Sequence, residues 1–92
     1  MEILRKRNLR PSSRQESSRY KIDTKKVSKD DVLIIEIYHE NNANELLFKY
    51  RVSGKDLSDK NQIHFSANEI NDNIEIIWHT EIKIENIFTK NN

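Results

Sequence analysis

Apolar and polar residues alternate with a period of two along much of the second half of the chain. The longest such stretch covers residues 73–88, in which even positions such as Ile74, Ile76 and Trp78 are apolar and most odd positions are polar. β-branched side chains favour extended backbone, and this alternation is typical of strands with one buried face. Because strands usually contain roughly five or six residues, we expect this stretch to bend from one sheet layer into another or to wrap around a small barrel.

A β-hairpin is predicted from two alternating segments, residues 32–40 and 45–53, and from the asparagine-rich sequence between them. Asparagine tolerates the left-handed backbone that tight turns require. A turn centred in that sequence places apolar pairs on one face and the opposite charges of Glu36 and Lys49 on the other, which cross-strand energetics favour. The expected pairs on the apolar face are Leu33–Val52, Ile35–Tyr50, Ile37–Phe48 and His39–Leu46, with Tyr38–Leu47 on the opposite face.

Two further strands and a short helical turn are expected around this hairpin. Residues 62–67 alternate in the same way and can pair with the long final stretch. The expected pairs are Ile63–Trp78 and Phe65–Ile76. Residues 19–24 predict an edge strand with basic outward residues, and the polar loop at 55–61 has room for one helical turn. Together these elements predict an all-β fold, a small antiparallel barrel or sandwich of four to five strands.

The beginning of the chain differs in composition from the rest. From Arg5 to Ser18 the only large aliphatic residue is Leu9, and the segment is rich in serine and in charge. A segment of this composition buries too little apolar area to offset the entropy lost on ordering. We therefore expect residues 1–18 to be a flexible basic arm and residues 19–92 to be a single small β domain.

Charge is divided unevenly along the chain. Residues 1–26 carry nine Lys or Arg and three acids, a net charge of +6, whereas residues 27–92 carry seven and twelve, a net charge of −5. Five of the six arginines lie in the first nineteen residues, and a planar guanidinium suits two-point contacts to phosphate or carboxylate. The predicted nucleic-acid-contacting residues are Arg5, Lys6, Arg7, Arg10, Arg14, Arg19, Lys21, Lys25 and Lys26.

Aromatic side chains supply a second set of candidate contacts, because they can stack on nucleic-acid bases. Those on the alternating apolar faces are expected in the core instead. These are Phe48, Tyr50, Phe65 and Trp78. Tyr20 and Tyr38 are the better candidates for exposure, and Tyr38 shares the outward face of the predicted hairpin with Lys49 and Arg51. We expect these last three residues to form an exposed patch.

Composition excludes or disfavours several classes of function. With no cysteine and one glycine, the chain cannot form a disulfide scaffold, a cysteine-ligated metal site or a glycine-rich phosphate loop. The histidines, His39, His64 and His79, have no metal-ligand spacing, and no pattern predicts an activated nucleophile, so we expect no metal, no cofactor and no enzymatic activity. The longest apolar run, residues 32–35, is too short to cross a bilayer, and a cytoplasmic location is expected.

These features favour a non-enzymatic binding module whose basic N-terminal arm contacts nucleic acid or another polyanionic surface. The alternative is a small protein–protein inhibitor, immunity or adaptor protein that uses an exposed strand edge or the acidic face of Glu75, Glu81 and Glu85. The basic segment could also be a solubilising tail with no partner, or it could fold back onto the acidic body. The acidic row could serve only to protect a strand edge. An open edge strand would also permit a dimer.

Overall fold

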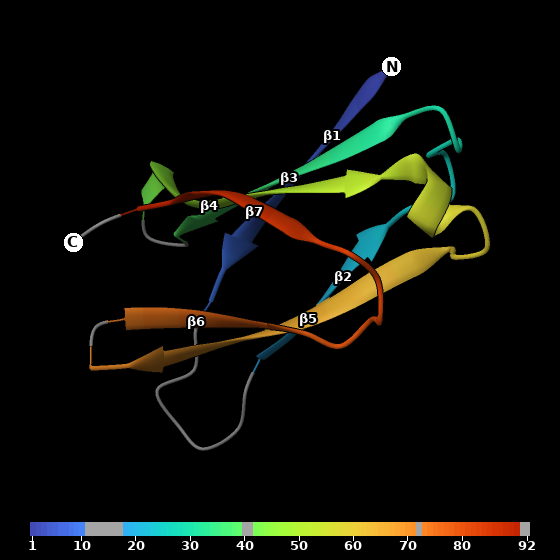
Figure 1. Cartoon of the computed structure of the whole chain (residues 1–92). Coiled ribbons are helices and arrows are strands. Elements are labelled where there is room, and N and C mark those ends of the chain that lie inside the picture. Colours follow the sequence, from blue (N-terminus) through green and yellow to red (C-terminus); the bar gives the residue numbers. More distant parts are fainter. Residues whose placement is uncertain (11–17, 40–41, 72, 91–92) are drawn as a thin grey trace.

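The computed structural model describes residues 1–10, 18–39, 42–71 and 73–90, which form two β-sheets packed face to face (Figure 1). The larger sheet has the strand order β1-β3-β4-β7, and the smaller has the order β2-β5-β6. The elements are β1 (Glu2–Leu9), β2 (Ser18–Asp23), β3 (Val32–His39), β4 (Asn42–Ser53), the 3₁₀ turn η1 (Gly54–Leu57), β5 (Gln62–Ile70), β6 (Asn73–Trp78) and β7 (Glu85–Thr89). The predicted all-β fold is therefore confirmed as a sandwich, and the described strands do not close into a barrel.

Strand β1 is the main departure from the sequence prediction. Residues 2–9, expected to belong to a flexible arm, pair with β3 along their whole length, and the pairing is parallel. Leu9 is fully buried and Ile3 packs against the core. The pattern of the sequence conceals this strand because the two alternating positions between Ile3 and Leu9 are arginines. The predicted arm is thus wrong for residues 2–9, and residues 11–17 lie outside the described residues.

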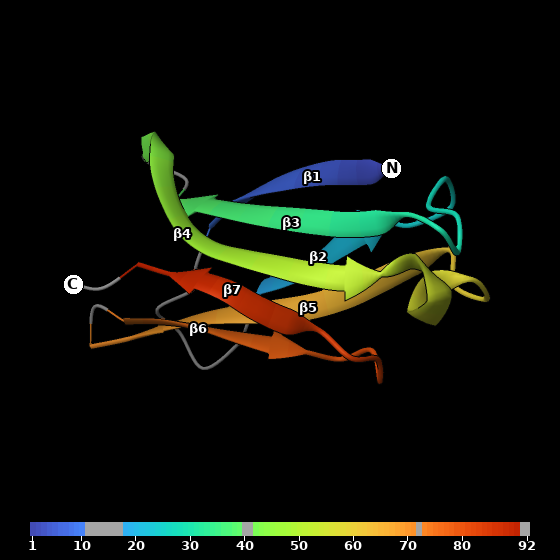
Figure 2. The ribbon, with the colours of Figure 1, turned by 45° about the horizontal axis from the view of Figure 1, so that its top comes forward.

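The predicted hairpin is formed by β3 and β4. The pairs Leu33–Val52, Ile35–Tyr50, Glu36–Lys49 and Ile37–Phe48 are confirmed. Beyond them the register shifts, so that Tyr38 lies opposite Leu46 and His39 lies opposite Asn42. The predicted pairs Tyr38–Leu47 and His39–Leu46 are wrong because a β-bulge adds residues to one strand, which alternation alone does not reveal. Figure 2 shows β4 curving strongly at this end of the hairpin.

The smaller sheet is built on β5, which pairs antiparallel with β2 on one side and with β6 on the other. The predicted edge strand is confirmed as β2, and its basic residues Arg19 and Lys21 are exposed. The pairing of β5 with β6 keeps the predicted faces but is displaced by two residues, so that Phe65 pairs with Trp78. A displacement by two leaves every side chain on the same face, so the pattern could predict the face but not the register.

The long alternating stretch at the end of the chain passes from one sheet to the other, as predicted. Its first part is β6 in the smaller sheet, and its last part is β7 at the edge of the larger sheet. Ile82 and Ile84, in the connection between them, pack against the core. Here the hydroxyl of Thr80 accepts a hydrogen bond from the backbone N–H of His64 at 3.1 Å. The crossing is therefore anchored by apolar burial and by this bond to β5.

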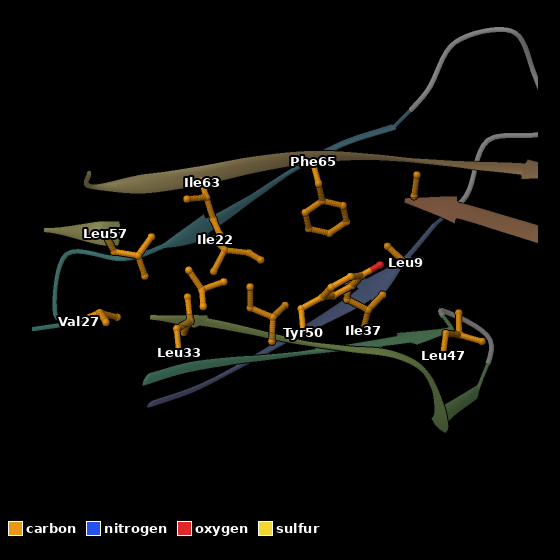
Figure 3. Packing of buried hydrophobic residues seen from close by; sticks show 13 residues of the cluster. Leu9, Ile22, Val27, Leu33, Ile37, Leu47, Tyr50, Leu57, Ile63 and Phe65 are labelled. Carbon is orange, nitrogen blue, oxygen red and sulfur yellow. The ribbon is translucent and has the colours of Figure 1, made fainter. Parts of the chain in front are cut away.

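The core lies between the two sheets (Figure 3). Ile22, Ile63 and Phe65 point inward from the smaller sheet and face Leu33, Ile37 and Tyr50 from the larger one. Aromatic rings meet at one end, with centroids of Phe65 and Trp78 4.9 Å apart and those of Tyr50 and Trp78 5.2 Å apart. The predicted core positions of Phe48, Tyr50, Phe65 and Trp78 are confirmed.

Candidate functional site

The candidate site is a groove of about 890 Å³ between the edge strands β1 and β2. Strand β1 is the first strand of the larger sheet and β2 is the first strand of the smaller one, so each has a free edge on this side of the sandwich. Among the residues that the structure describes, seven from three strands line the groove. They are Lys6, Arg7 and Asn8 of β1, Arg19, Tyr20 and Lys21 of β2, and Tyr38 of β3.

Two arginines of β1 connect the edges of the two sheets. Nε of Arg7 donates a hydrogen bond to the backbone carbonyl of Lys21 at 2.8 Å, and Nε of Arg5 donates one to the carbonyl of Asp23 at 3.4 Å. These arginines are two residues apart on β1, and the carbonyls that accept from them are two residues apart on β2. Charged side chains that point inward are one means by which proteins protect an edge strand from pairing with another chain. We call Arg5 and Arg7 the arginine bridge; it fixes the spacing of the groove walls.

The groove is strongly basic. Lys6, Arg7, Arg19 and Lys21 are all exposed, and none of the described residues that line the groove is a carboxylate. In the part of the chain that the structure describes, none of these four cations takes part in a salt bridge. Like charges gathered in a concave surface reinforce one another and attract anions.

The aromatic wall of the groove consists of Tyr20 and Tyr38. The ring of Tyr20 stacks on the buried ring of Phe65, with centroids 5.0 Å apart and planes at 15°, and its hydroxyl accepts a hydrogen bond from the backbone N–H of Arg10 at 2.7 Å. The hydroxyl of Tyr38 donates to Oε1 of Glu36 at 2.9 Å, and this bond raises the pKa of Tyr38. Both rings are therefore held in place at neutral pH.

The structure brings together only part of the predicted set of basic residues. Lys6, Arg7, Arg19 and Lys21 line the groove, as described above. Arg5 is half-buried beside it in the arginine bridge, and Arg10 follows β1 directly. Lys25 and Lys26 are exposed in the turn after β2 and do not line the groove. Arg14 lies outside the described residues.

The predicted patch of Tyr38, Lys49 and Arg51 is divided by the structure. Tyr38 belongs to the groove, whereas Lys49 and Arg51 line a separate depression on the outer face of the larger sheet. Glu36 lies between the two surfaces, with Oε2 3.7 Å from Nζ of Lys49. The parallel register also places Glu36 beside Lys6. The patch prediction did not consider this carboxylate.

Asn8 is the groove residue that sequence reasoning missed. It lies two positions after Lys6 on the same face of β1, and recognising β1 as a strand would have placed the two side by side. Tyr20 was expected to be exposed, but it is half-buried, because its ring packs against the core and stacks on Phe65.

Among the described residues, no group of three His, Cys, Asp or Glu side chains could hold a metal ion. No helix in the same part of the chain has the length and apolar character needed to span a membrane. Comparisons of the chain with protein-family models, with curated proteins and with solved structures gave no match. The functional argument therefore depends on the geometry and charge of the groove.

Proposed function

We propose that this protein is a non-enzymatic module that binds nucleic acid through its phosphate backbone, in the groove between β1 and β2. The observation that carries the proposal is the convergence of Lys6, Arg7, Arg19 and Lys21 on one concave surface, whose described lining residues include no carboxylate. Contacts of this kind provide affinity without sequence preference. Of the basic residues predicted from the sequence, these four remain the proposed binding residues, and they belong to two ordered strands, β1 and β2.

Because the arginine bridge connects the two sheet edges, we propose that the groove has its binding shape before an anion binds. Nε of Arg7 holds the two sheet edges together. The two terminal nitrogens of the guanidinium are therefore available to bind an anion. A guanidinium held by one hydrogen bond loses less rotamer entropy when an anion binds to its other nitrogens. Phosphate would therefore meet a groove whose walls are already at their binding distance.

The test is the salt dependence of binding to a fluorescent oligonucleotide, measured by anisotropy. Four groove cations predict a slope of about −3 for the logarithm of the affinity of a single strand against the logarithm of the salt concentration. A triple variant, Lys6→Gln with Arg19→Gln and Lys21→Gln, should reduce this slope to about −1. Arg7 stays unchanged in this variant because it also connects the sheets.

A matched control removes the same charge elsewhere. Lys29, Lys55 and Lys83 are exposed and do not line the groove, so their joint replacement by glutamine should leave the slope within about one unit of the original. Equal losses in the two triple variants would mean that net charge and not the groove determines binding. No binding to any oligonucleotide at low salt would refute the proposed function.

A second candidate function is supported by the exposure of β7. This strand forms the edge of the larger sheet opposite β1, and all five of its residues are exposed, including Ile87 and Phe88. An exposed edge can accept a strand from a partner protein, as an inhibitor, immunity or adaptor protein would require. Replacing Ile87 by proline, which cannot donate a backbone hydrogen bond, should abolish such an interaction and leave oligonucleotide binding unchanged.

A further inference from the structure

We infer that the groove selects single-stranded nucleic acid, with bases stacked on the rings of Tyr20 and Tyr38. This inference rests on the proposed function and adds to it the class of nucleic acid. Both rings line the same groove as the four cations. A flexible strand can therefore place its phosphates on the cations and its bases on the rings at the same time.

Tyr20 provides the more rigid of the two stacking surfaces. One face of its ring is covered by Phe65, which is fully buried, at a centroid distance of 5.0 Å. The hydrogen bond from the Arg10 backbone to its hydroxyl prevents the ring from tilting away. The part of the ring that lines the groove is therefore its other face and edge, presented by the protein core. An ordered ring binds a base at a smaller entropic cost than a mobile one.

Tyr38 also lines the groove and lies on β3, beside Asn8 of β1 in the larger sheet. Its hydroxyl is held by Glu36, and Nζ of Lys6 lies over the ring, 5.9 Å from its centroid. A base that stacks on this face of Tyr38 would displace the ammonium of Lys6 from the ring, and the flexible lysine side chain would then be free to contact a phosphate. The combination of a basic track with aromatic rings is how proteins bind single strands with little sequence preference.

Base pairing determines the expected selectivity. In a duplex the faces of the bases are stacked on one another, so the two tyrosine rings cannot stack on them. Only the phosphate contacts remain. In a single strand each base that stacks on an aromatic ring increases the affinity by about tenfold or more. Single strands should therefore bind more tightly than duplexes, although duplexes have the higher charge density.

The experiment compares ligands that have the same phosphates and differ in their bases, using the full chain. Thymidine and uridine oligonucleotides of about twelve residues are compared with an abasic strand and a duplex of equal length. We expect the strands with bases to bind about 100-fold more tightly than the abasic strand and the duplex, equivalent to about 2.7 kcal/mol for two stacked bases. Tyr38→Leu should remove one of the two stacking contacts and bring the thymidine strand to within about tenfold of the abasic one.

Phe88→Leu is the matched control, because Phe88 is a partly exposed aromatic residue on the opposite edge of the larger sheet. It should leave every affinity unchanged. Equal affinity for the thymidine and abasic strands would overturn base stacking while the proposed function stands. A polyglutamate peptide that binds as tightly as thymidine would also overturn it, because its carboxylates offer no base to stack. Absence of binding to all these ligands would instead refute the proposed function itself.

Discussion

Replacing the single glycine of the chain should destabilise the fold strongly. Gly54 follows β4 directly, and its backbone N–H donates a hydrogen bond to the carbonyl of Asp31 at 2.8 Å. A Cβ atom at this position would lie 1.9 Å from the carbonyl oxygen of Ser28 and 2.6 Å from that of Asp31. The φ angle of Gly54 is not positive. Glycine is therefore required because there is no room for a side chain, and not because of the backbone conformation.

The expected magnitude for Gly54→Ala follows from that overlap. Real Cβ contacts are essentially never shorter than 3.0 Å, so the two backbone segments must separate by about 1.1 Å, the difference between 3.0 and 1.9 Å. Overpacking of this kind costs about 1–3 kcal/mol, and loss of the hydrogen bond to Asp31 adds about 1 kcal/mol. A loss of about 2–4 kcal/mol is a large part of the roughly 5–14 kcal/mol typical of a chain of this length.

Urea unfolding followed by the fluorescence of Trp78 measures this effect, because Trp78 lies against Tyr50 and Phe65 in the folded state. The midpoint should fall while the slope of the free energy against urea stays unchanged. Ser53→Ala is the matched control, since the neighbouring Ser53 is exposed and its side chain does not cap η1. If the free energy of unfolding of Gly54→Ala lies within about 0.5 kcal/mol of that of the original protein, the carbonyls of Ser28 and Asp31 do not approach Gly54 as closely as described.

Two further predictions concern charge. The backbone N–H of Ser28 donates to the carboxylate of Asp31 and lowers the pKa of Asp31 below its ordinary 3.8. The bond therefore stabilises the fold above that value and is lost as the pH falls through the lower, folded-state pKa. Asp31→Asn should be less stable than the original protein at pH 7, and urea unfolding at about pH 3 should show a smaller difference; a constant difference would contradict this. Glu36→Gln should tighten oligonucleotide binding roughly two- to fivefold in anisotropy titrations, because Glu36 lies beside Lys6 and Tyr38; unchanged or weaker binding would contradict it.

Much of the sheet structure could be predicted from the alternation of residues. The pairs Leu33–Val52, Ile35–Tyr50 and Ile37–Phe48 follow from matching the apolar faces, and the opposite charges of Glu36 and Lys49 select the same register. The crossing from β6 to β7 follows from the length of the final alternating stretch. The remaining pairings could not be predicted, because a bulge near Tyr38 and a displacement by two between β5 and β6 leave the apolar pattern intact.

The sequence predicted the basic residues of the candidate site but not the groove in which they lie. The basic residues of the N-terminal segment suggested an anion-binding function, and four of them line the groove. The prediction of a flexible arm failed because Arg5 and Arg7 occupy inward positions of an edge strand, where their side chains reach backbone carbonyls of β2. An inward arginine is unfavourable in the centre of a core but suits the side of a sandwich, where its guanidinium remains close to water.

The proposed position of the anion site is tested most directly by mapping the backbone amide resonances of the full chain during titration with a thymidine oligonucleotide. We predict that the largest shifts occur in β1 and β2, at residues 6–8 and 19–21, and that the amides of β7 change little. Shifts concentrated in β7, or spread evenly over exposed lysines, would contradict the proposal that anions bind in the groove between the two sheet edges.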